Sequence, residues 1–416
     1  MDIQIDPKRL NQSLQNLGSI GSSVTGMQRL AYSNEDIEGR RYISKLMTEA
    51  GLEVRVDAAG NMIGRRDGSV DELPVIAMGS HTDTVPDGGK YDGALGVLGA
   101  IETVRALNDF GWITRHPIEV INFSNEEGTG VSRWLYGSRA MAGLLSDEDI
   151  GQDAIEEREI ADRLDKIGGN LLRIESAVRD SREFRAYLEL HIEQGPILYQ
   201  SEIQIGLVTA ITGKIALKVS VRGVANHAGT TPMDGRRDPL LAASHIIQTV
   251  NKIAKVNDIC RVATVGNLLV SPGQGSVIPG NVDLDVEFRD VEMEKMDEAE
   301  LKFRNSMKLL EEQFGVSISV ERHGSTQPEK VASLIKSNME IAAKELEFTM
   351  LDMPSGAGHD AQAMAHLTEV GMIFVPSLYG VSHSPEEYSS PEDCANGTNV
   401  LLRSLIAIDN YSVALD

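Results

Sequence analysis

Histidines and acidic residues in this sequence recur directly after apolar segments, in a combination that could bind metal ions. Three imidazoles and several carboxylates, without a cysteine among them, suit Zn²⁺, Mn²⁺ or Co²⁺ and not an iron–sulfur or copper site. Metal ions held in this way activate water, so the pattern favours a metal-dependent hydrolase. The residues concerned are His81, Asp92, Glu126, Glu127, His191 and His383.

The adjacent pair Glu126 and Glu127 has a use in such a site. Neighbours on an extended backbone point to opposite sides, so one carboxylate could bind metal while the other faces the reacting water as general base. Asp83 could accept a hydrogen bond from the second nitrogen of the His81 imidazole. Each residue also has an ordinary interpretation, because a strand-end histidine is commonly structural and paired glutamates are commonly solvated. Because several of these residues each follow directly after an apolar segment, we favour the metal-site interpretation.

A second cluster of polar residues lies in the segment GVANHAGTTPMDGRRD, residues 223–238. Small and hydroxyl residues around His227 expose backbone and imidazole together, which suggests binding of an anion or a carbonyl. The same segment could equally be a rigid turn before a helix that begins at Asp238. The pattern alone leaves both interpretations open.

Two further positions have a functional and a structural interpretation. Arg289 lies on the polar face of an alternating segment and could grip a carboxylate with two hydrogen bonds, although a surface ion pair with a neighbouring aspartate is the simpler interpretation. The glycine-rich segment PSGAGHD, residues 354–360, could present backbone N–H groups to an anionic substrate or form a tight loop. It contains Gly358 and His359.

Four apolar segments, residues 74–81, 118–124, 186–192 and 371–377, are predicted to be buried parallel strands that alternate with helices. The carboxyl ends of such strands form the ligand crevice of an open α/β sheet, which would bring the strand-end residues together. One of the helices is expected to begin after Ser33 as its cap.

The pattern changes near residue 213, where strands with one polar face alternate with amphipathic helices in the order β-α-β-β-α-β. This order is typical of a ferredoxin-like α+β sandwich. We therefore predict a discontinuous α/β domain with a largely parallel mixed sheet, residues 1–212 and 328–416, and an inserted α+β domain, residues 213–327.

The composition excludes some classes of function. A net charge of −23 and 5% aromatic residues argue against binding to nucleic acid. The sequence has neither an uninterrupted apolar stretch of about 20 residues nor a leader-like N-terminus, so we expect no membrane span and no secretion signal. Two cysteines without a pairing pattern fit a reducing compartment, and we expect a cytoplasmic protein.

The motifs GSHTDTVPDGGKYDG, NEEG, LELHIEQG, NHAGTTPM, SGAGHD and IFVPSLYGVSHSP together resemble the amidase, hydantoinase and carbamoylase branch of the M20 metallopeptidase-like family. The resemblance runs from about residue 27 to about residue 394. This branch contains N-carbamoyl-L-amino acid hydrolases, allantoate amidohydrolases, ureidoglycolate amidohydrolases and β-ureidopropionases.

The resemblance implies two divalent ions per subunit, Zn²⁺ or Mn²⁺, with Co²⁺ or Ni²⁺ as alternatives. One ion would be bound by His81 and His191 and the other by Glu127 and His383, with Asp92 between them. Glu126 would then be the general base. These roles come from the family and not from the spacing of the residues.

The resemblance also implies that the inserted domain is a lid and a dimerisation domain. His227 and Arg289 would contact the substrate from it, and the lid histidine would complete the site of the partner subunit in a homodimer. Gln194 and His359, with Gly358 beside the latter, would lie close to the substrate.

Two departures from the family pattern concern the substrate. Ser276 stands where the family usually has an asparagine that touches the substrate carboxylate, and Gly130 and Val131 stand where Arg-Phe is common. We predict an amidohydrolase that cleaves linear N-carbamoyl compounds, foremost N-carbamoyl-L-amino acids, and releases ammonia and carbon dioxide. The alternatives are an allantoate or ureidoglycolate amidohydrolase, an M20 peptidase or acylase, and a binding protein without catalysis.

Overall fold

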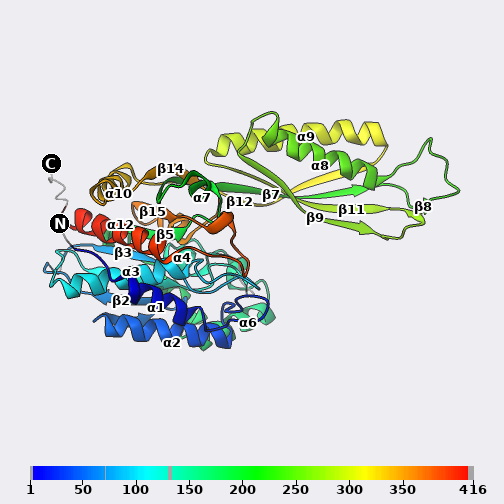
Figure 1. Ribbon diagram of the computed structural model, residues 1–416. Helices are drawn as coiled ribbons and strands as arrows, with labels where there is room; N and C mark the ends of the chain where they lie inside the picture. The colour runs from blue at the N-terminus through cyan, green and yellow to red at the C-terminus, as the bar shows by residue number, and fades with distance from the viewer. Residues whose placement is uncertain (1–2, 71, 130–133, 411–416) are drawn as a thin grey trace. The chain divides into compact units, whose positions relative to one another are not determined.

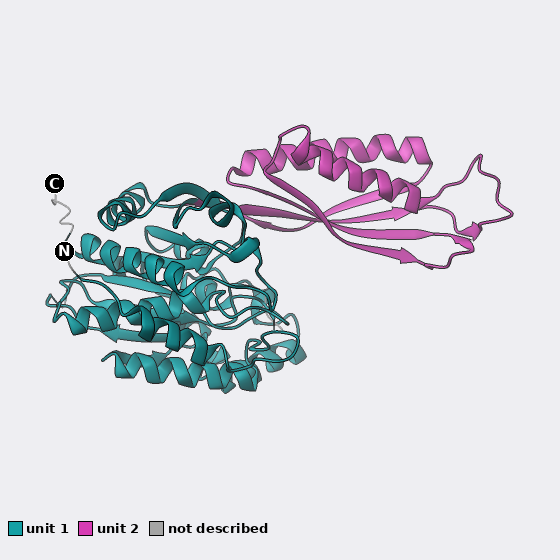
Figure 2. Cartoon of the chain, viewed as in Figure 1, with its two compact units in different colours: residues 1–209, 331–416 teal, residues 210–330 magenta. Residues whose placement is uncertain are grey.

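The computed structural model describes residues 3–70, 72–129 and 134–410, and the chain divides into two compact units. Unit 1 comprises residues 1–209 and 331–416, and unit 2 comprises residues 210–330 (Figure 2). The boundaries expected at 212/213 and 327/328 each differ from this division by three residues. Gly130 and Val131, one of the two departures, lie outside the described residues.

A nine-stranded mixed sheet is the frame of unit 1, although its edge strand β13 and the last two residues of β6 fall within residues 210–330. Its centre is parallel, because β3 pairs in parallel with β4 and β5, and β5 pairs in parallel with β15. The pairs β1·β2, β2·β4 and β15·β6 are antiparallel, so the predicted fold class is confirmed. In order across the sheet the strands are β1 (Glu53–Val56), β2 (Met62–Arg66), β4 (Ile118–Phe123), β3 (Val75–His81), β5 (Phe184–Ile192), β15 (Val370–Val375), β6 (Ile205–Ile211) and β13 (Glu329–Lys330), and β14 (Met350–Ser355) pairs with β6.

The helices of unit 1 pack on this sheet through one large apolar core. The long helices α3 and α12 contact each other, and they contact β3, β5 and β15 (Figure 1). Helix α2 begins after Ser33, whose Oγ accepts a hydrogen bond from the backbone N–H of Asp36 at 3.1 Å, as predicted. The helices are α1 (Pro7–Leu17), α2 (Asn34–Glu49), α3 (Ala94–Asp109), α4 (Tyr136–Met141), α5 (Asp147–Ile150), α6 (Ala154–Lys166), α7 (Ile197–Ser201), α10 (Ser333–Glu345), α11 (Asp360–Met364) and α12 (Pro391–Asn410).

Unit 2 is an antiparallel four-stranded sheet with two helices, in the order β-α-β-β-α-β apart from two short strands. The strands alternate buried and exposed residues, and their buried side chains form a second apolar core with both helices. The elements are β7 (Gly213–Arg222), α8 (Pro239–Lys255), β9 (Val262–Ser271), β11 (Asn281–Asp290), α9 (Met293–Phe314) and β12 (Ser317–Thr326), and the short strands β8 (Asn226–His227) and β10 (Val277–Ile278) pair with each other.

Across the described ranges, the helices include none with the length and apolar character that a membrane span requires.

Candidate metal centre

The parallel strands bring several of the predicted ligands to one edge of the sheet. His81 is the last residue of β3, and His191 is the penultimate residue of β5, its parallel neighbour. Glu126 and Glu127 follow β4, which is paired with the other side of β3. Because neighbouring parallel strands end at the same edge, these side chains converge as the sequence predicted.

Asp92 reaches the same edge from the loop before α3. Gly93 follows it with φ +63°, and a Cβ at that position would lie 2.4 Å from the His81 ring. Glycine is therefore required both by the backbone conformation and by the close approach of the imidazole. His383 lies in the loop between β15 and α12 and has φ +52°.

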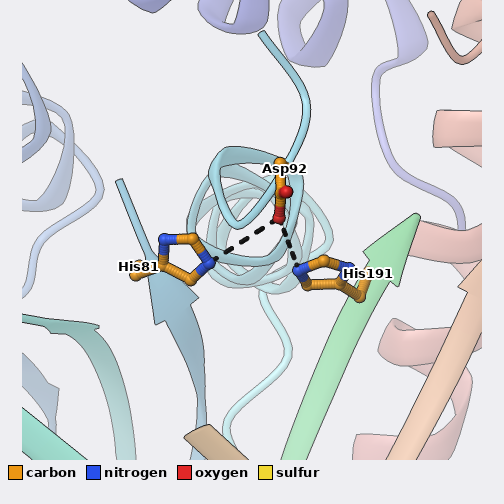
Figure 3. Close-up of side chains that lie close together, drawn as sticks. All are labelled: His81, Asp92 and His191. Carbon is orange, nitrogen blue, oxygen red and sulfur yellow. Dashed lines mark ion pairs between the residues drawn. The ribbon is translucent and has the colours of Figure 1, made fainter. Parts of the chain in front are cut away.

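The first group of three consists of His81, Asp92 and His191 (Figure 3). Oδ1 of Asp92 lies 3.1 Å from Nε2 of His191 and 3.8 Å from Nε2 of His81. All three side chains are at most 6% exposed. A buried carboxylate oxygen between two imidazole nitrogens is a donor set that a divalent ion can use.

The second group consists of Asp92, Glu127 and His383. The other carboxylate oxygen of Asp92, Oδ2, lies 3.0 Å from Nε2 of His383. Oε1 of Glu127 lies 3.6 Å from the same nitrogen. The two oxygens of Asp92 thus face different groups of candidate ligands.

Hydrogen bonds to the backbone set the orientation of two imidazoles. Nδ1 of His81 donates to the carbonyl oxygen of Asp83 at 3.0 Å, and Nδ1 of His191 donates to that of Ile192 at 2.9 Å. Each bond leaves Nε2 directed at the cluster, as a metal-binding histidine requires.

Asp83 accepts the hydrogen bond from Nδ1 of His81, as the sequence suggested, and it does so through its backbone carbonyl oxygen. Its carboxylate lies 3.8 Å from Nδ1 of His81, and it accepts hydrogen bonds from the backbone N–H groups of Glu126 at 3.3 Å and Glu127 at 3.2 Å. The carboxylate therefore holds the Glu126–Glu127 turn, while the carbonyl of the same residue holds His81.

The charges of the cluster shift its pKa values strongly. Burial lowers the pKa of His81 to about 4, so this imidazole is neutral. Burial also acts to lower the pKa of His191, but the hydrogen bond and the charge of Asp92 outweigh it and raise that pKa to about 9. The hydrogen bond with Asp92 likewise raises the pKa of His383 to about 9. Burial favours the neutral form of Asp92, yet its bonds with both histidines hold its pKa well below the usual range.

Glu126 lies beside the first group. Its Oε2 is 3.7 Å from Nε2 of His81, and the residue is 7% exposed. Burial and the adjacent charge of Glu127 raise the pKa of Glu126 well above its usual range. A carboxyl group with a raised pKa beside a candidate metal site is suited to moving a proton.

The other predicted residues of unit 1 lie around the cluster. Gln194 donates from Nε2 to Oδ2 of Asp92 at 2.8 Å, with His383 at 3.4 Å from the same atom. His359 is 2% exposed, its Nε2 forms a 2.8 Å hydrogen bond with Oγ of Ser355, and its ring stands 4.4 Å from that of His191. Gly358 packs against Trp134, since a Cβ there would lie 2.3 Å from the indole.

His227, Ser276 and Arg289 belong to unit 2 and are described within that unit. His227 is exposed, and its Nδ1 accepts hydrogen bonds from the backbone N–H groups of residues 229 and 230 at 3.0 and 3.2 Å. Ser276 is exposed and accepts a backbone hydrogen bond from residue 228 at 2.9 Å. Nε of Arg289 donates to Glu287 at 2.6 Å, which is the ion pair that the sequence pattern favoured, with a glutamate as the neighbour.

Sequence reasoning did not single out Glu387. This buried glutamate contacts the loops that carry Asp92 and His383. In the sequence, Glu387 is marked only as a glutamate four positions after His383. Glu386 beside it is also a glutamate, and the sequence does not tell that Glu386 is exposed while Glu387 is buried.

Comparisons with known proteins agree with this geometry. Residues 77–407 match the family described as Peptidase family M20/M25/M40. The chain is 40% identical to the N-carbamoyl-L-amino-acid amidohydrolase of Paenarthrobacter aurescens, over 97% of this chain and 98% of that protein. It is 37% identical to the ureidoglycolate hydrolase of Oryza sativa subsp. japonica, over 95% of this chain and 84% of that protein. A crystal structure of an amidase of the hydantoinase/carbamoylase family from Burkholderia multivorans superimposes with a TM-score of 0.89 at 35% identity, covering 99% of this chain and 100% of that one.

Proposed function

Because the chain belongs to the M20 family, with relatives among the N-carbamoyl-L-amino acid amidohydrolases, we propose that it hydrolyses the carbamoyl C–N bond of N-carbamoyl-L-amino acids. It is a hydrolase of non-peptide C–N bonds. The observation that carries the proposal is Asp92, whose two oxygens face two groups of ligands, with Glu126 beside them.

The residues present fit a pair of divalent cations. Among the described residues, no lysine or arginine forms an ion pair with Asp92, Glu126 or Glu127, so no fixed positive charge competes with a metal ion for these carboxylates. We propose that His81 and His191 hold one ion, that Glu127 and His383 hold the other, and that Asp92 contacts both. Imidazole and carboxylate donors suit Zn²⁺ or Mn²⁺, with Co²⁺ or Ni²⁺ as substitutes.

When bound, the ions lower the pKa of water and polarise the carbamoyl oxygen. Glu126 accepts the proton of the attacking water and returns it to the leaving nitrogen. Its raised pKa makes the Glu126 carboxylate a stronger base, which favours the first of these steps. The products are the amino acid, ammonia and carbon dioxide.

We propose that residues beside the metal centre in unit 1 contact the substrate. Gln194 is held by Asp92, so its amide is oriented for contact with a bound ligand, and Gly358 and His359 line the same region of unit 1. By the family resemblance, we also propose substrate contacts for His227, Ser276 and Arg289, with His227 acting in the site of the partner subunit. The pair with Glu287 fixes the Arg289 guanidinium, which we propose recognises the substrate carboxylate.

We also propose that the protein is a cytoplasmic homodimer that associates through unit 2. Strand β9 is an edge strand of the unit 2 sheet, and its Leu269 is 60% exposed. Leu241 on α8 is 50% exposed. An apolar edge strand of this kind is a surface that proteins normally cover. The two cysteines, Cys260 and Cys394, are free thiols, which fits a reducing compartment.

A substrate panel tests the activity. Ammonia release is measured with N-carbamoyl-L-amino acids, N-carbamoyl-β-alanine, allantoate and ureidoglycolate, and amine release with dipeptides, each with Mn²⁺ or Zn²⁺ supplied. The proposal expects the highest kcat/KM with an N-carbamoyl-L-amino acid. A preference for allantoate or ureidoglycolate would favour the alternative that the plant relative represents, and cleavage of dipeptides alone would favour a peptidase.

The variant Glu126→Gln tests the general base. We expect it to keep its metal content and to lose about 10²–10⁴-fold in kcat, the usual contribution of a positioned acid–base group. Glu386→Gln is the matched control, because Glu386 is an exposed glutamate outside the cluster. Binding of ureido compounds by the wild-type enzyme without any turnover would instead establish a binding protein.

A further inference from the structure

Glu387 is a buried carboxylate in the loop between His383 and α12, and it is 4% exposed. Its Oε1 accepts hydrogen bonds from two successive backbone N–H groups, those of Tyr91 at 2.9 Å and of Asp92 at 3.0 Å. Bonds from N–H groups to a charged carboxylate are among the stronger hydrogen bonds in proteins. One oxygen therefore fixes the backbone that carries Asp92.

The other oxygen of Glu387 acts on the loop that carries His383. Oγ of Ser382 donates to Oε2 of Glu387 at 2.7 Å, and the same hydroxyl lies 3.4 Å from Oδ2 of Asp92. Ser382 directly precedes His383, whose backbone is held at φ +52°. A single side chain thus connects the loops of two candidate ligands that are almost 300 positions apart in the chain.

Gly89 shows that this contact depends on close packing. A Cβ on Gly89 would lie 2.2 Å from Cδ and Oε1 of Glu387 and 2.4 Å from its Cβ. Real Cβ atoms do not approach so closely, so any larger residue at position 89 displaces the carboxylate. The glycine is required here by the proximity of Glu387 alone, since its φ lies outside the left-handed region.

We propose that Glu387 is a positioning residue, which holds the Asp92 loop and the His383 loop in register and thereby sets the metal affinity of the centre. This inference rests on the proposed metal-dependent function. Asp92 contributes to both groups of ligands, so a displaced Asp92 loop weakens both sites together. Residues that orient ligands commonly contribute about 10–100-fold to metal affinity.

The test measures metal affinity directly, by titrating demetallated protein with Zn²⁺ in the presence of a competing chelator. We expect Glu387→Ala and Gly89→Ala each to weaken binding by about 10–100-fold. In Glu387→Gln, the amide oxygen can still accept the two backbone N–H bonds, and the amide NH₂ can donate to the Ser382 hydroxyl. We therefore expect the Zn²⁺ affinity of this variant to stay within about 3-fold of wild type. Glu386→Ala is the control and should bind as the wild type does, because Glu386 is exposed.

Each outcome decides between interpretations. If Glu387→Ala binds Zn²⁺ with wild-type affinity, or if Glu387→Gln is as weak as Glu387→Ala, the positioning role is wrong. Should Glu387→Ala and Gly89→Ala fail to fold in circular dichroism, Ser382→Ala removes one arm alone, and wild-type affinity in that variant would overturn the proposal. A wild-type protein that binds no metal would contradict the proposed function itself, which is a different result.

Discussion

Metal binding by this protein should release protons, and the pKa values of the histidines in the candidate metal centre determine how many. In the metal-free form, His191 and His383 each form a hydrogen bond with Asp92, and both have a pKa of about 9. Both imidazoles are therefore almost fully protonated at pH 7. A metal ion binds the neutral imidazole, so each histidine must lose its proton first.

The size of the effect follows from the two pKa values. At pH 7 an imidazole with a pKa of about 9 is ~99% protonated, whereas one at the ordinary 6.5 is ~25% protonated. The two histidines together should release about 2 protons, against about 0.5 without the shift. Proton competition should also weaken the apparent affinity of each site ~100-fold at pH 7 relative to a pH above 9.

Isothermal titration calorimetry of demetallated protein measures the release. Zn²⁺ is titrated at pH 7 in several buffers of different ionisation enthalpy, and the dependence of the observed heat on that enthalpy gives the proton number. The raised pKa of Glu127 adds to the release in the same direction. A release below one proton per subunit, with both sites filled, would refute the reasoning, because it would show that the histidines are neutral before the metal arrives.

Three further predictions follow from the same contacts. In the folded metal-free protein the pKa values of His191 and His383 lie above 6.5, so protonation of these histidines stabilises the fold fully below pH 6.5. This stabilisation is lost as the pH rises through about 9. The Tm of the metal-free protein should therefore fall between these two pH values, and a constant Tm would contradict the prediction. Asp83→Ala removes the acceptor of two backbone N–H groups and should lower metal affinity or kcat about 10–100-fold, as measured by chelator competition and turnover. Leu269→Asp on the β9 edge should convert the proposed dimer to a monomer in light scattering, while Val24→Asp, at a fully exposed position of unit 1, should not; equal masses for both variants would place the interface elsewhere.

The sequence was sufficient for the parts of the site that depend on parallel strands. The proximity of His81 and His191 could be predicted because each lies at the end of a buried strand, and neighbouring parallel strands end at the same edge of a sheet. The inserted unit could be recognised because its strands alternate buried and exposed residues, whereas β3 at the centre of the unit 1 sheet is buried along its whole length. The cap of α2 at Ser33 is a local feature with a local signal.

Contacts that depend on loops could not be predicted. The sharing of Asp92 between two groups came from the family resemblance, since spacing does not tell which oxygen faces which imidazole. Asp83 was expected to accept a hydrogen bond from His81, but the sequence does not tell whether its carbonyl or its carboxylate reaches the ring, because that depends on the backbone path after β3. Glu386 and Glu387 are both glutamates, and only the three-dimensional structure shows that Glu387 is buried and Glu386 exposed.

The position of β15 in the sheet has a consequence for biosynthesis. This strand lies between β5 and β6, although it is made after the whole of unit 2. Between the end of β5 at residue 192 and the start of β15 at residue 370, translation at ~5–20 residues per second takes roughly 10–35 s. During that interval the emerging chain has open strand edges at β5 and β6, while the contiguous unit 2 can already fold. We expect unit 1 of the nascent protein to depend on chaperones until its last strand closes the sheet.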